Sequence, residues 1–346
     1  MKKIYLVSVL PLLLITSCNN KTQKEYFKLW NDCASIKLLK EFVEDVTNKD
    51  SKNFIPAEDR IATFDMDGTF IGELFPNYFE YNLLEYRALD DPNYKNKDES
   101  VIEAANAIRK YNREREKLPD HFDMVHARAA AKAYAGMTIP EFDKYVKDYA
   151  KKEAVGFTGL TYANGFYKPM LEVFDYLKDN DFKYYVVSGS DRFICRSLVE
   201  SIGIEPDRVI GMDVEYMASN QGEEEGVDYT YTLEDHLVRT ENLLIKNLKT
   251  NKVKQISQEI GKVPVLSFGN SDGDCAMHNY CMQNPTYKSA AFMVVADDFD
   301  RDHTDQKRAD RAIAWKENNY TIISEKDDWK TIYGEGVQKA KFPWEN

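Results

Sequence analysis

The 346-residue chain has little cysteine, little histidine and, beyond its first residues, no long apolar run. Five cysteines in a chain of this length exclude a small scaffold built on disulfides. Neither the cysteines nor the five histidines show the spacing of a zinc site. Cys195 and Cys275 are interpreted as buried small apolar residues, and the sequence leaves open whether Cys275 pairs with Cys281.

Basic residues are also scarce relative to acidic ones. The chain has 46 Lys and Arg against 58 Asp and Glu, a formal net charge of −12. Nucleic acid is therefore not expected as a partner, because binding to phosphate backbones needs clustered Lys and Arg. A small anionic substrate remains compatible, since the local field of a pocket can differ from the net charge.

The first 18 residues resemble the signal peptide of a bacterial lipoprotein. Lys2 and Lys3 precede an apolar stretch from Ile4 to Ile15, and Thr16-Ser17-Cys18 follows. About 12 apolar residues fall short of the roughly 20 that span a bilayer, which favours a cleaved signal over an anchor. The resemblance implies that Cys18 is lipidated and begins the mature chain. The resemblance also implies that the protein lies in the bacterial cell envelope, in the periplasm, and that its lipid holds it to a membrane. The sequence leaves open which membrane and which leaflet this is.

Short apolar runs alternate with helical segments along most of the chain. This alternation predicts an α/β fold with a parallel sheet. Gln221 to Gly226, which contains three glutamates, is interpreted as a solvated turn in a small β excursion. The predicted strands are 61–64, 184–187, 208–212, 263–268 and 291–296, and the predicted helices between them are 169–178, 193–202 and 253–260.

The span from 71 to 164 is predicted to be mostly helical instead. Ser100 to Glu103 and Thr138 to Glu141 match the capping-box pattern of a helix start. Residues 121–135 are rich in alanine and end at Gly136, which favours a helix C-terminus there.

Polar clusters follow three of the predicted strands. The first strand leads into Asp65-Met66-Asp67-Gly68-Thr69, the second into Ser188-Gly189-Ser190, and the fourth into Gly269-Asn270-Ser271-Asp272-Gly273-Asp274. In open parallel sheets, ligands bind beyond the carboxyl ends of the strands. Carboxylates can attack as nucleophiles, exchange protons and bind Mg²⁺, while hydroxyls, amides and a lysine such as Lys252 hold phosphoryl oxygens.

Taken in order, the aspartate motif, Ser188, Lys252 and the Gly269–Asp274 cluster resemble the four motifs of the haloacid dehalogenase (HAD) superfamily. The resemblance is closest to its phosphoserine-phosphatase-like phosphatases and covers about residues 57–335. It implies a Rossmann-like three-layer core over 27–70 and 165–346, an inserted helical cap domain over 71–164, and a tether over 19–26.

The resemblance also implies a role for each motif residue. Asp65 is expected to attack phosphorus and form an aspartyl-phosphate, and Asp67 to act as general acid and then general base. Phosphate is expected to contact Ser188, the amide of Gly189, Lys252 and Thr69. Mg²⁺ is expected to bind Asp65, the backbone carbonyl of Asp67 and a side chain of the last motif.

Asn270 departs from the family pattern, which usually has an aspartate at that position. We expect its amide oxygen to bind the metal more weakly, because one negative charge is missing. Asp272 is the alternative ligand, and Asp274 is expected either to bind the metal or to support the residues that do. A calcium loop is disfavoured at 65–76 and 270–281, since each lacks glycine at the sixth position and an acid at the twelfth.

The predicted function is Mg²⁺-dependent hydrolysis of a small phosphorylated metabolite, a phosphomonoester. Asp67 favours a phosphatase over a dehalogenase, because halide departs without a proton. Two alternatives stay open: a phosphotransferase or phosphomutase, and a membrane-anchored binding lipoprotein that has lost efficient turnover. The substrate and the oligomeric state are not predicted.

The aromatic group after the aspartate motif allows two interpretations. Phe75, Tyr78, Phe79 and Tyr81 either line the substrate pocket or pack inside the cap, and packing is favoured. Glu73 and Asn77, just beyond the nucleophile loop, are candidate substrate contacts.

Overall fold

The computed structural model describes residues 24–73, 75–95 and 98–345. Cys18, the predicted signal peptide and the tether up to residue 23 lie outside these ranges. Within them, no helix combines the length and the apolar character needed to cross a membrane.

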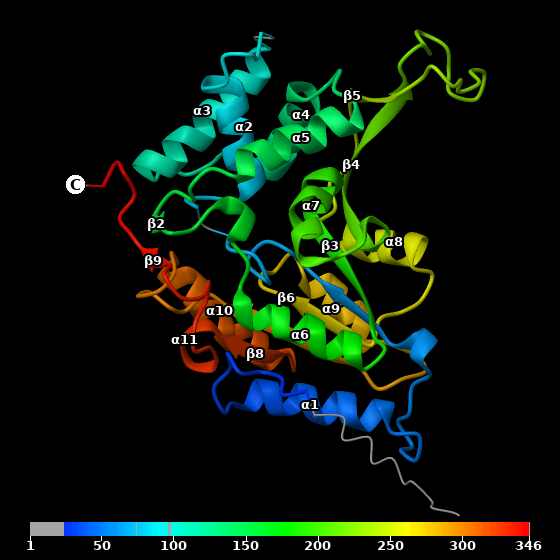
Figure 1. Ribbon diagram of the computed structural model, residues 1–346, viewed down its shortest axis with the longest axis vertical. Coiled ribbons are helices and arrows are strands. Elements are labelled where there is room, and N and C mark those ends of the chain that lie inside the picture. Colours follow the sequence, from blue (N-terminus) through cyan, green and yellow to red (C-terminus); the bar gives the residue numbers. More distant parts are fainter. Residues whose placement is uncertain (1–23, 74, 96–97, 346) are drawn as a thin grey trace, which may run out of the picture.

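A seven-stranded sheet forms the centre of the molecule, with the order β5-β4-β3-β1-β6-β7-β8 (Figure 1). Neighbouring strands are parallel except for β4 and β5, which are antiparallel. The strands are β1 (Ile61–Phe64), β3 (Lys183–Asp191), β4 (Val209–Ala218), β5 (Leu237–Ile245), β6 (Leu266–Gly269), β7 (Ala290–Val295) and β8 (Thr321–Ser324). A separate antiparallel pair is formed by β2 (Phe157–Thr158) and β9 (Gln338–Lys339).

Helices cover both faces of the sheet. Along β7, Phe292 and Val294 belong to one core cluster, whereas Met293 and Val295 belong to another, as the alternation of a strand requires. The first face packs against α1 (Ala34–Thr47), α6 (Lys168–Asp179) and α7 (Arg192–Val199), and the second against α8 (Thr250–Glu259), α9 (Cys275–Met282) and α10 (Gln306–Glu317); the short α11 (Glu325–Asp328) follows β8. The predicted α/β fold with a Rossmann-like, largely parallel sheet is confirmed.

β1 lies in the middle of the sheet, and all four of its residues are buried. It pairs in parallel with β3 and with β6, and Phe64 is the register partner of both Val186 and Phe268. The rings of Phe64 and Phe268 stack with centroids 4.3 Å apart. Because these strands are aligned and parallel, the segments that follow them meet at one edge of the sheet.

Four helices lie over that edge (Figure 1): α2 (Phe79–Leu89), α3 (Glu99–Glu114), α4 (Phe122–Ala133) and α5 (Ile139–Ala150). We call α2 to α5 the helical unit. The two chain crossings that join it to the sheet lie side by side, because Ile71 forms a bridge with Phe166 and the Gly72 amide donates to the Gly165 carbonyl at 2.7 Å. The boundaries of a cap domain at 71 and 164 stay a prediction.

The helical unit also contacts β5. The amide of Gly136 donates to the Arg239 carbonyl, and the Arg239 amide donates to the Met137 carbonyl, both at 2.9 Å. Glu80 of α2 forms a buried ion pair with Lys246, just after β5, at 2.8 Å. The helical unit is therefore held at a second place besides its two crossings.

Beyond the sheet, β4 and β5 continue into an arm that protrudes from the molecule, at the upper right of Figure 1. Residues 219–236 form its tip. The small β excursion predicted around Gln221 to Gly226 is confirmed, with that segment at the exposed turn.

The predicted ends of helices and strands were partly wrong. The capping box at Ser100 does not form, because Asp98 precedes it and its carboxylate accepts from the amides of Ser100 and Val101. The box at Thr138 is confirmed. β6 begins at Leu266 and not at 263, since Pro264 has no amide to donate. β3 runs past 187 to Asp191.

Candidate active site

The loop after β1 carries the two aspartates. The Asp65 amide still donates to the Phe268 carbonyl at 2.9 Å, so Asp65 extends the ladder of the sheet by one residue. The chain then turns at Gly68, whose φ of +78° disfavours any residue with a Cβ. A Cβ there would also lie 1.9 Å from Nδ2 of Asn270. Glycine at this position lets the loops after β1 and β6 come together.

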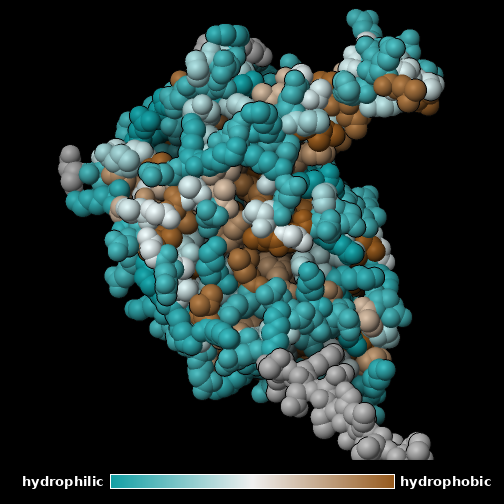
Figure 2. Space-filling model, viewed as in Figure 1, coloured by the Kyte–Doolittle hydropathy of each residue, from teal (hydrophilic) through white to brown (hydrophobic). Residues whose placement is uncertain are grey.

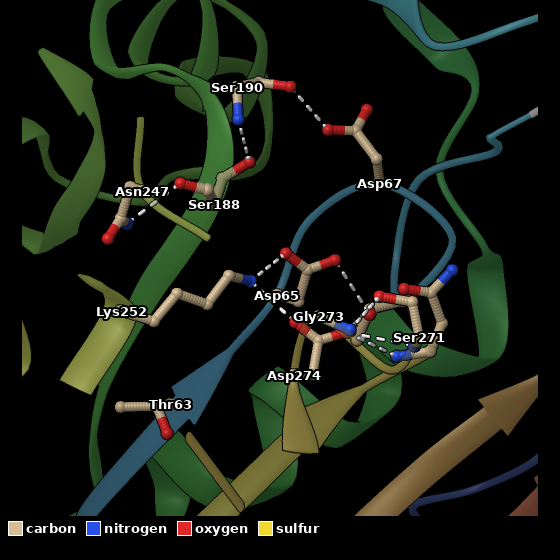
Figure 3. A network of polar contacts seen from close by, with 12 residues as sticks. Thr63, Asp65, Asp67, Ser188, Ser190, Asn247, Lys252, Ser271, Gly273 and Asp274 are labelled. Atoms are coloured by element: carbon tan, nitrogen blue, oxygen red, sulfur yellow. Dashed lines mark hydrogen bonds and ion pairs between the residues drawn. The ribbon is translucent and has the colours of Figure 1, made fainter. Parts of the chain in front are cut away.

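Lys252 joins those loops through a buried ion-pair network (Figure 3). Its Nζ lies 2.5 Å from Oδ1 of Asp65 and 2.7 Å from Oδ1 of Asp274. The other carboxylate oxygen of Asp274 accepts from the amides of Asn270 at 3.1 Å and Ser271 at 3.0 Å. One cation at the start of α8 thus fixes the nucleophile candidate against the loop after β6.

Lys252 lies between two buried carboxylates whose pKa values shift in opposite directions. Burial and the charge of Asp274 raise the pKa of Asp65 to about 7, against the opposing effect of Lys252. Burial opposes ionisation of Asp274 as well, but the charge of Lys252 and its hydrogen bond hold the pKa of Asp274 below its usual range. The pKa of Lys252 is raised because the attraction of both carboxylates outweighs its burial.

Asp67 lies in a different environment, facing Ser190 at the end of β3. The Ser190 hydroxyl donates to Oδ2 of Asp67 at 2.8 Å. Oδ1 of Asp67 is buried and has no hydrogen-bond partner in the part of the chain that the structure describes. Burial and the charge of Asp65 raise the pKa of Asp67 to about 8. A protonated Asp67 can donate its proton to an oxygen in front of it.

The predicted phosphate-binding residues differ in their placement. Gly189 borders the cavity described below, and a Cβ there would lie 2.5 Å from Cδ2 of Leu248. Ser188 is fully buried and does not line that cavity; its hydroxyl accepts from the Ser190 amide at 3.0 Å. Thr69 is also buried behind the loop, with its hydroxyl 3.4 Å from Oδ2 of Asp65.

Asn270, where the resemblance led us to expect an aspartate, is held by a charged partner. Its Nδ2 donates to Oε2 of Glu73 at 2.7 Å, which directs its Oδ1 away from that carboxylate. Glu73 in turn pairs with Arg308 at 2.8 Å, so Glu73 does not line the cavity. Asp272 lies outside the cavity too, since it is exposed and accepts from Trp315 at 3.1 Å.

These placements define what the site offers a metal ion. Across residues 24–73, 75–95 and 98–345, no group of three His, Cys, Asp or Glu is arranged to hold one. Both oxygens of Asp274 are engaged, whereas Oδ2 of Asp65 has, among the described side chains, only the 3.4 Å contact with the Thr69 hydroxyl. The candidate donors are therefore Oδ2 of Asp65, the Asp67 carbonyl and Oδ1 of Asn270. Such a set of oxygens with few carboxylates fits Mg²⁺, which keeps several of its waters.

The helical unit closes a small cavity over these residues. The cavity holds about 70 Å³, little compared with the roughly 300–1,000 Å³ of most ligand pockets. Tyr78, Tyr81 and Asp123 line it, together with the Glu80–Lys246 ion pair, whereas Phe75 and Phe79 pack in the core. The remaining lining residues are Asp65, Asp67, Gly189, Ser190, Leu248, Lys252, Asn270, Ser271 and Asp274.

Several residues of this site were missed from the sequence. Ser190 lies in a motif already singled out, so its nearness to Ser188 was the available signal. Glu80 and Lys246 gave none, because they are 166 residues apart and meet only through the fold. Behind Glu80, burial lowers the pKa of His126 to about 4, which leaves this histidine neutral.

The fold is shared with solved structures, although no protein-family model matches the chain and no curated protein matches its sequence. One similar structure is a functionally unknown protein from Anaerococcus prevotii, with 18% identity, 87% of this chain and 94% of that chain covered, and a TM-score of 0.53. Another is a cytosolic 5′-nucleotidase IIIB bound to cytidine. It is 12% identical, the match covers 86% of this chain and 87% of that chain, and the TM-score is 0.50.

A third structural neighbour is a HAD family hydrolase from Salmonella enterica serovar Typhi. It is 14% identical, and the match covers 77% of this chain and 67% of that chain. The TM-score of 0.41 indicates only a distant structural similarity. At such identities the comparisons show a common fold and leave the activity to be argued from the site.

Proposed function

We propose that this protein is a phosphatase of the HAD type that hydrolyses a small phosphomonoester through an aspartyl-phosphate, with Mg²⁺ as cofactor. One observation carries the proposal: Asp65 and Asp67 face the same cavity. Asp65 is ion-paired to Lys252, and one carboxyl oxygen of Asp67 has no partner among the described residues. The cavity is small, which suits a phosphoryl group and a compact leaving group.

In the proposed reaction, a carboxylate oxygen of Asp65 attacks phosphorus while the bond from phosphorus to the leaving oxygen breaks. Asp67 gives its proton to that oxygen. Asp67 then takes a proton from water, the water oxygen attacks phosphorus, and the bond between Asp65 and phosphorus breaks. Phosphate leaves and both aspartates return to their starting states.

The other residues hold the transferred group. Lys252 has a third hydrogen to donate besides those directed at Asp65 and Asp274, and the Gly189 backbone borders the cavity where an oxygen would lie. Mg²⁺ would be held by Asp65, the Asp67 carbonyl and Asn270, and it would supply positive charge against the phosphoryl oxygens. With Asn270 in place of an aspartate, we expect this Mg²⁺ to bind weakly.

The test is release of phosphate from p-nitrophenyl phosphate by the purified full chain, with and without Mg²⁺. We expect Mg²⁺-dependent turnover that falls at least about 10³-fold in Asp65→Asn. The matched control is Asp50→Asn, which alters an exposed aspartate after α1 and should keep the wild-type rate. Acid quenching with substrate labelled in its phosphate should leave base-labile label on the wild type only. Equal rates for wild type and Asp65→Asn would favour a binding protein without turnover.

We further propose that the protein acts in the bacterial cell envelope as a lipoprotein anchored through Cys18, supported by the signal-like first 18 residues. Cells fed radiolabelled palmitate should label the wild-type chain and not Cys18→Ala. Unlabelled wild type would contradict the anchor and leave the phosphatase proposal untouched.

A further inference from the structure

The tip of the β4–β5 arm has a composition unlike the rest of the surface. Residues 219–236 contain six Asp and Glu and no Lys or Arg. Two apolar side chains of the tip project into solvent, Val227 with 91% and Leu233 with 106% relative exposure. Figure 2 shows apolar atoms gathered on the arm at the upper right. The tip therefore combines negative charge with two fully exposed apolar side chains.

The base of the same arm borders a groove of about 650 Å³ that runs along β5 between α4 and α8. Three cations line it, Arg128, Lys246 and Lys254, with one acid, Glu241. Lys246 is already paired with the buried Glu80, so the free positive charge of the groove comes from Arg128 and Lys254. Within the described ranges, neither Arg128 nor Lys254 forms an ion pair. The groove also exposes apolar surface from Met124, Leu243 and Leu244. It is therefore basic and partly apolar, the complement of the tip.

β5 leaves part of its outer edge open beside this groove. It is the end strand of the sheet, with β4 on one side only. On its other side, residues 238 and 239 are hydrogen bonded to the segment between α4 and α5. In the described chain, no residue from 240 to 245 forms a bridge or a backbone hydrogen bond to another segment at this outer edge, and the Asn242 amide donates to the Thr240 hydroxyl at 3.1 Å. Leu244 is 63% exposed. An open edge of this kind accepts a further strand.

We propose that two copies of this chain associate antiparallel along β5, so that the acidic tip of each copy lies in the basic groove of the other. The tip adjoins the start of β5 at Leu237, and the groove is lined by Glu241 to Lys246, about 14 to 31 Å further along the strand at ~3.4 Å per residue. An antiparallel two-fold arrangement therefore brings both tips to both grooves at once, in an isologous interface.

A second copy suits the tip better than a membrane surface. Membrane surfaces that attract proteins electrostatically do so through anionic lipids. Such lipids would repel a tip that has six acidic residues and no Lys or Arg. The groove offers the opposite charge on the same molecule, and its Met and Leu side chains match Val227 and Leu233. The chain thus carries both halves of one contact.

The dimer would place the second copy's tip beside the active-site cavity. Lys246 lines both the cavity and the groove. A tip seated in the groove would therefore border the route by which a leaving group could extend from the cavity. The association itself depends only on the arm and the groove, so it stands or falls separately from the proposed phosphatase activity.

The first test is sedimentation velocity on the purified full chain over a concentration series. We expect a dimer whose dissociation constant rises at least about 10-fold in Arg128→Glu/Lys254→Glu, and likewise in Glu223→Lys/Glu224→Lys/Glu225→Lys. The chain that carries all five substitutions has lysines at 223–225 and an acidic groove, and should dimerise more tightly than the chain with either set of substitutions alone. Lys307→Glu/Lys316→Glu, on exposed positions of α10, is the matched control and should dimerise as wild type does.

The second test uses cysteine pairs in mixed chains. Leu233→Cys and Arg128→Cys, made in separate chains and mixed, should form a disulfide between copies. Leu233→Cys mixed with Ile313→Cys, which lies on exposed α10, should not. A monomer at tens of micromolar, or a dimer unaffected by the charge substitutions, would overturn the proposal. A monomer that floats with lipid vesicles through its tip would overturn it in favour of a membrane.

Discussion

Replacing Lys252 by methionine tests whether one buried cation holds the active site together. Methionine keeps an unbranched stem of similar length but removes the charge between Asp65 and Asp274. Lys252 is 1% exposed and both ion pairs are shorter than 3 Å, and the methionine side chain offers no donor in place of the lost charge. The two carboxylates are left buried beside one another.

The expected cost follows from that burial. Removing one partner of a buried ion pair destabilises a protein by about 3–5 kcal/mol, because an uncompensated charge remains. Total stabilities are only about 5–15 kcal/mol, so Lys252→Met should lose a large share. Urea unfolding followed by tryptophan fluorescence at pH 7 measures it. Lys307→Met, at an exposed position of α10, should stay within about 0.5 kcal/mol of wild type.

A second substitution separates charge from shape. Asp274→Asn retains an oxygen for the amides of Asn270 and Ser271, but it removes one of the two stranded charges. The double variant with Lys252→Met should therefore be more stable than the sum of the single effects predicts, by about 2 kcal/mol. A Lys252→Met cost below about 1 kcal/mol, or strict additivity in the double variant, would refute this account of the site.

Three further outcomes are expected. Asn270→Asp should destabilise the protein by roughly 1–2 kcal/mol, because it replaces a donor to Glu73 by a like charge, and Glu73→Gln in the same chain should restore stability in a thermal melt. Ser190→Ala should lower kcat roughly 10-fold, since Asp67 loses the hydroxyl that orients it, with a larger loss for phenyl than for p-nitrophenyl phosphate. His278→Asn should flatten the dependence of the free energy of unfolding on pH between about 6.5 and 4, by up to about 3 kcal/mol.

The sign of the last effect comes from burial, which lowers the pKa of His278 to about 4. Between the ordinary pKa and this value the unfolded chain binds a proton that the folded chain does not. The stability due to a neutral His278 is therefore complete above pH 6.5 and is lost as the pH falls towards 4. An unchanged slope in His278→Asn would contradict this effect of burial, and His236→Asn, on the exposed arm, is the control.

For Ser190, equal losses of kcat with phenyl phosphate and p-nitrophenyl phosphate would contradict its role in orienting Asp67. Ser190→Thr should retain activity.

The central strands could be predicted because burial on both faces leaves a plain signal. Residues 61–64 are apolar except for Thr63, and β1 is buried throughout. β5 was missed for the opposite reason: Arg239, Thr240, Glu241 and Asn242 interrupt its apolar residues, and an edge strand needs no buried face. Local rules also compete, as when Asp98 capped α3 in place of Ser100.

The site could be predicted as far as its motifs reach. The order of Asp65, Asp67 and Lys252 indicated which residues would meet, and all three line one cavity. The partners that tune them could not be predicted, because their contacts cross the fold. Asn270 meets Glu73 across 197 positions, and Glu80 meets Lys246 across 166. No spacing rule covers such pairs.

The position of β1 has a consequence for how fast the candidate active site assembles during folding. Its neighbours in the sheet come from residues 183–191 and 266–269, so the pairs that fix Asp65 close loops of more than 100 residues on both sides. Closing loops of this length is slow, because chain entropy is lost before the contacts stabilise anything. Activity should therefore return late after dilution from urea, together with the completed sheet and after most of the helical signal.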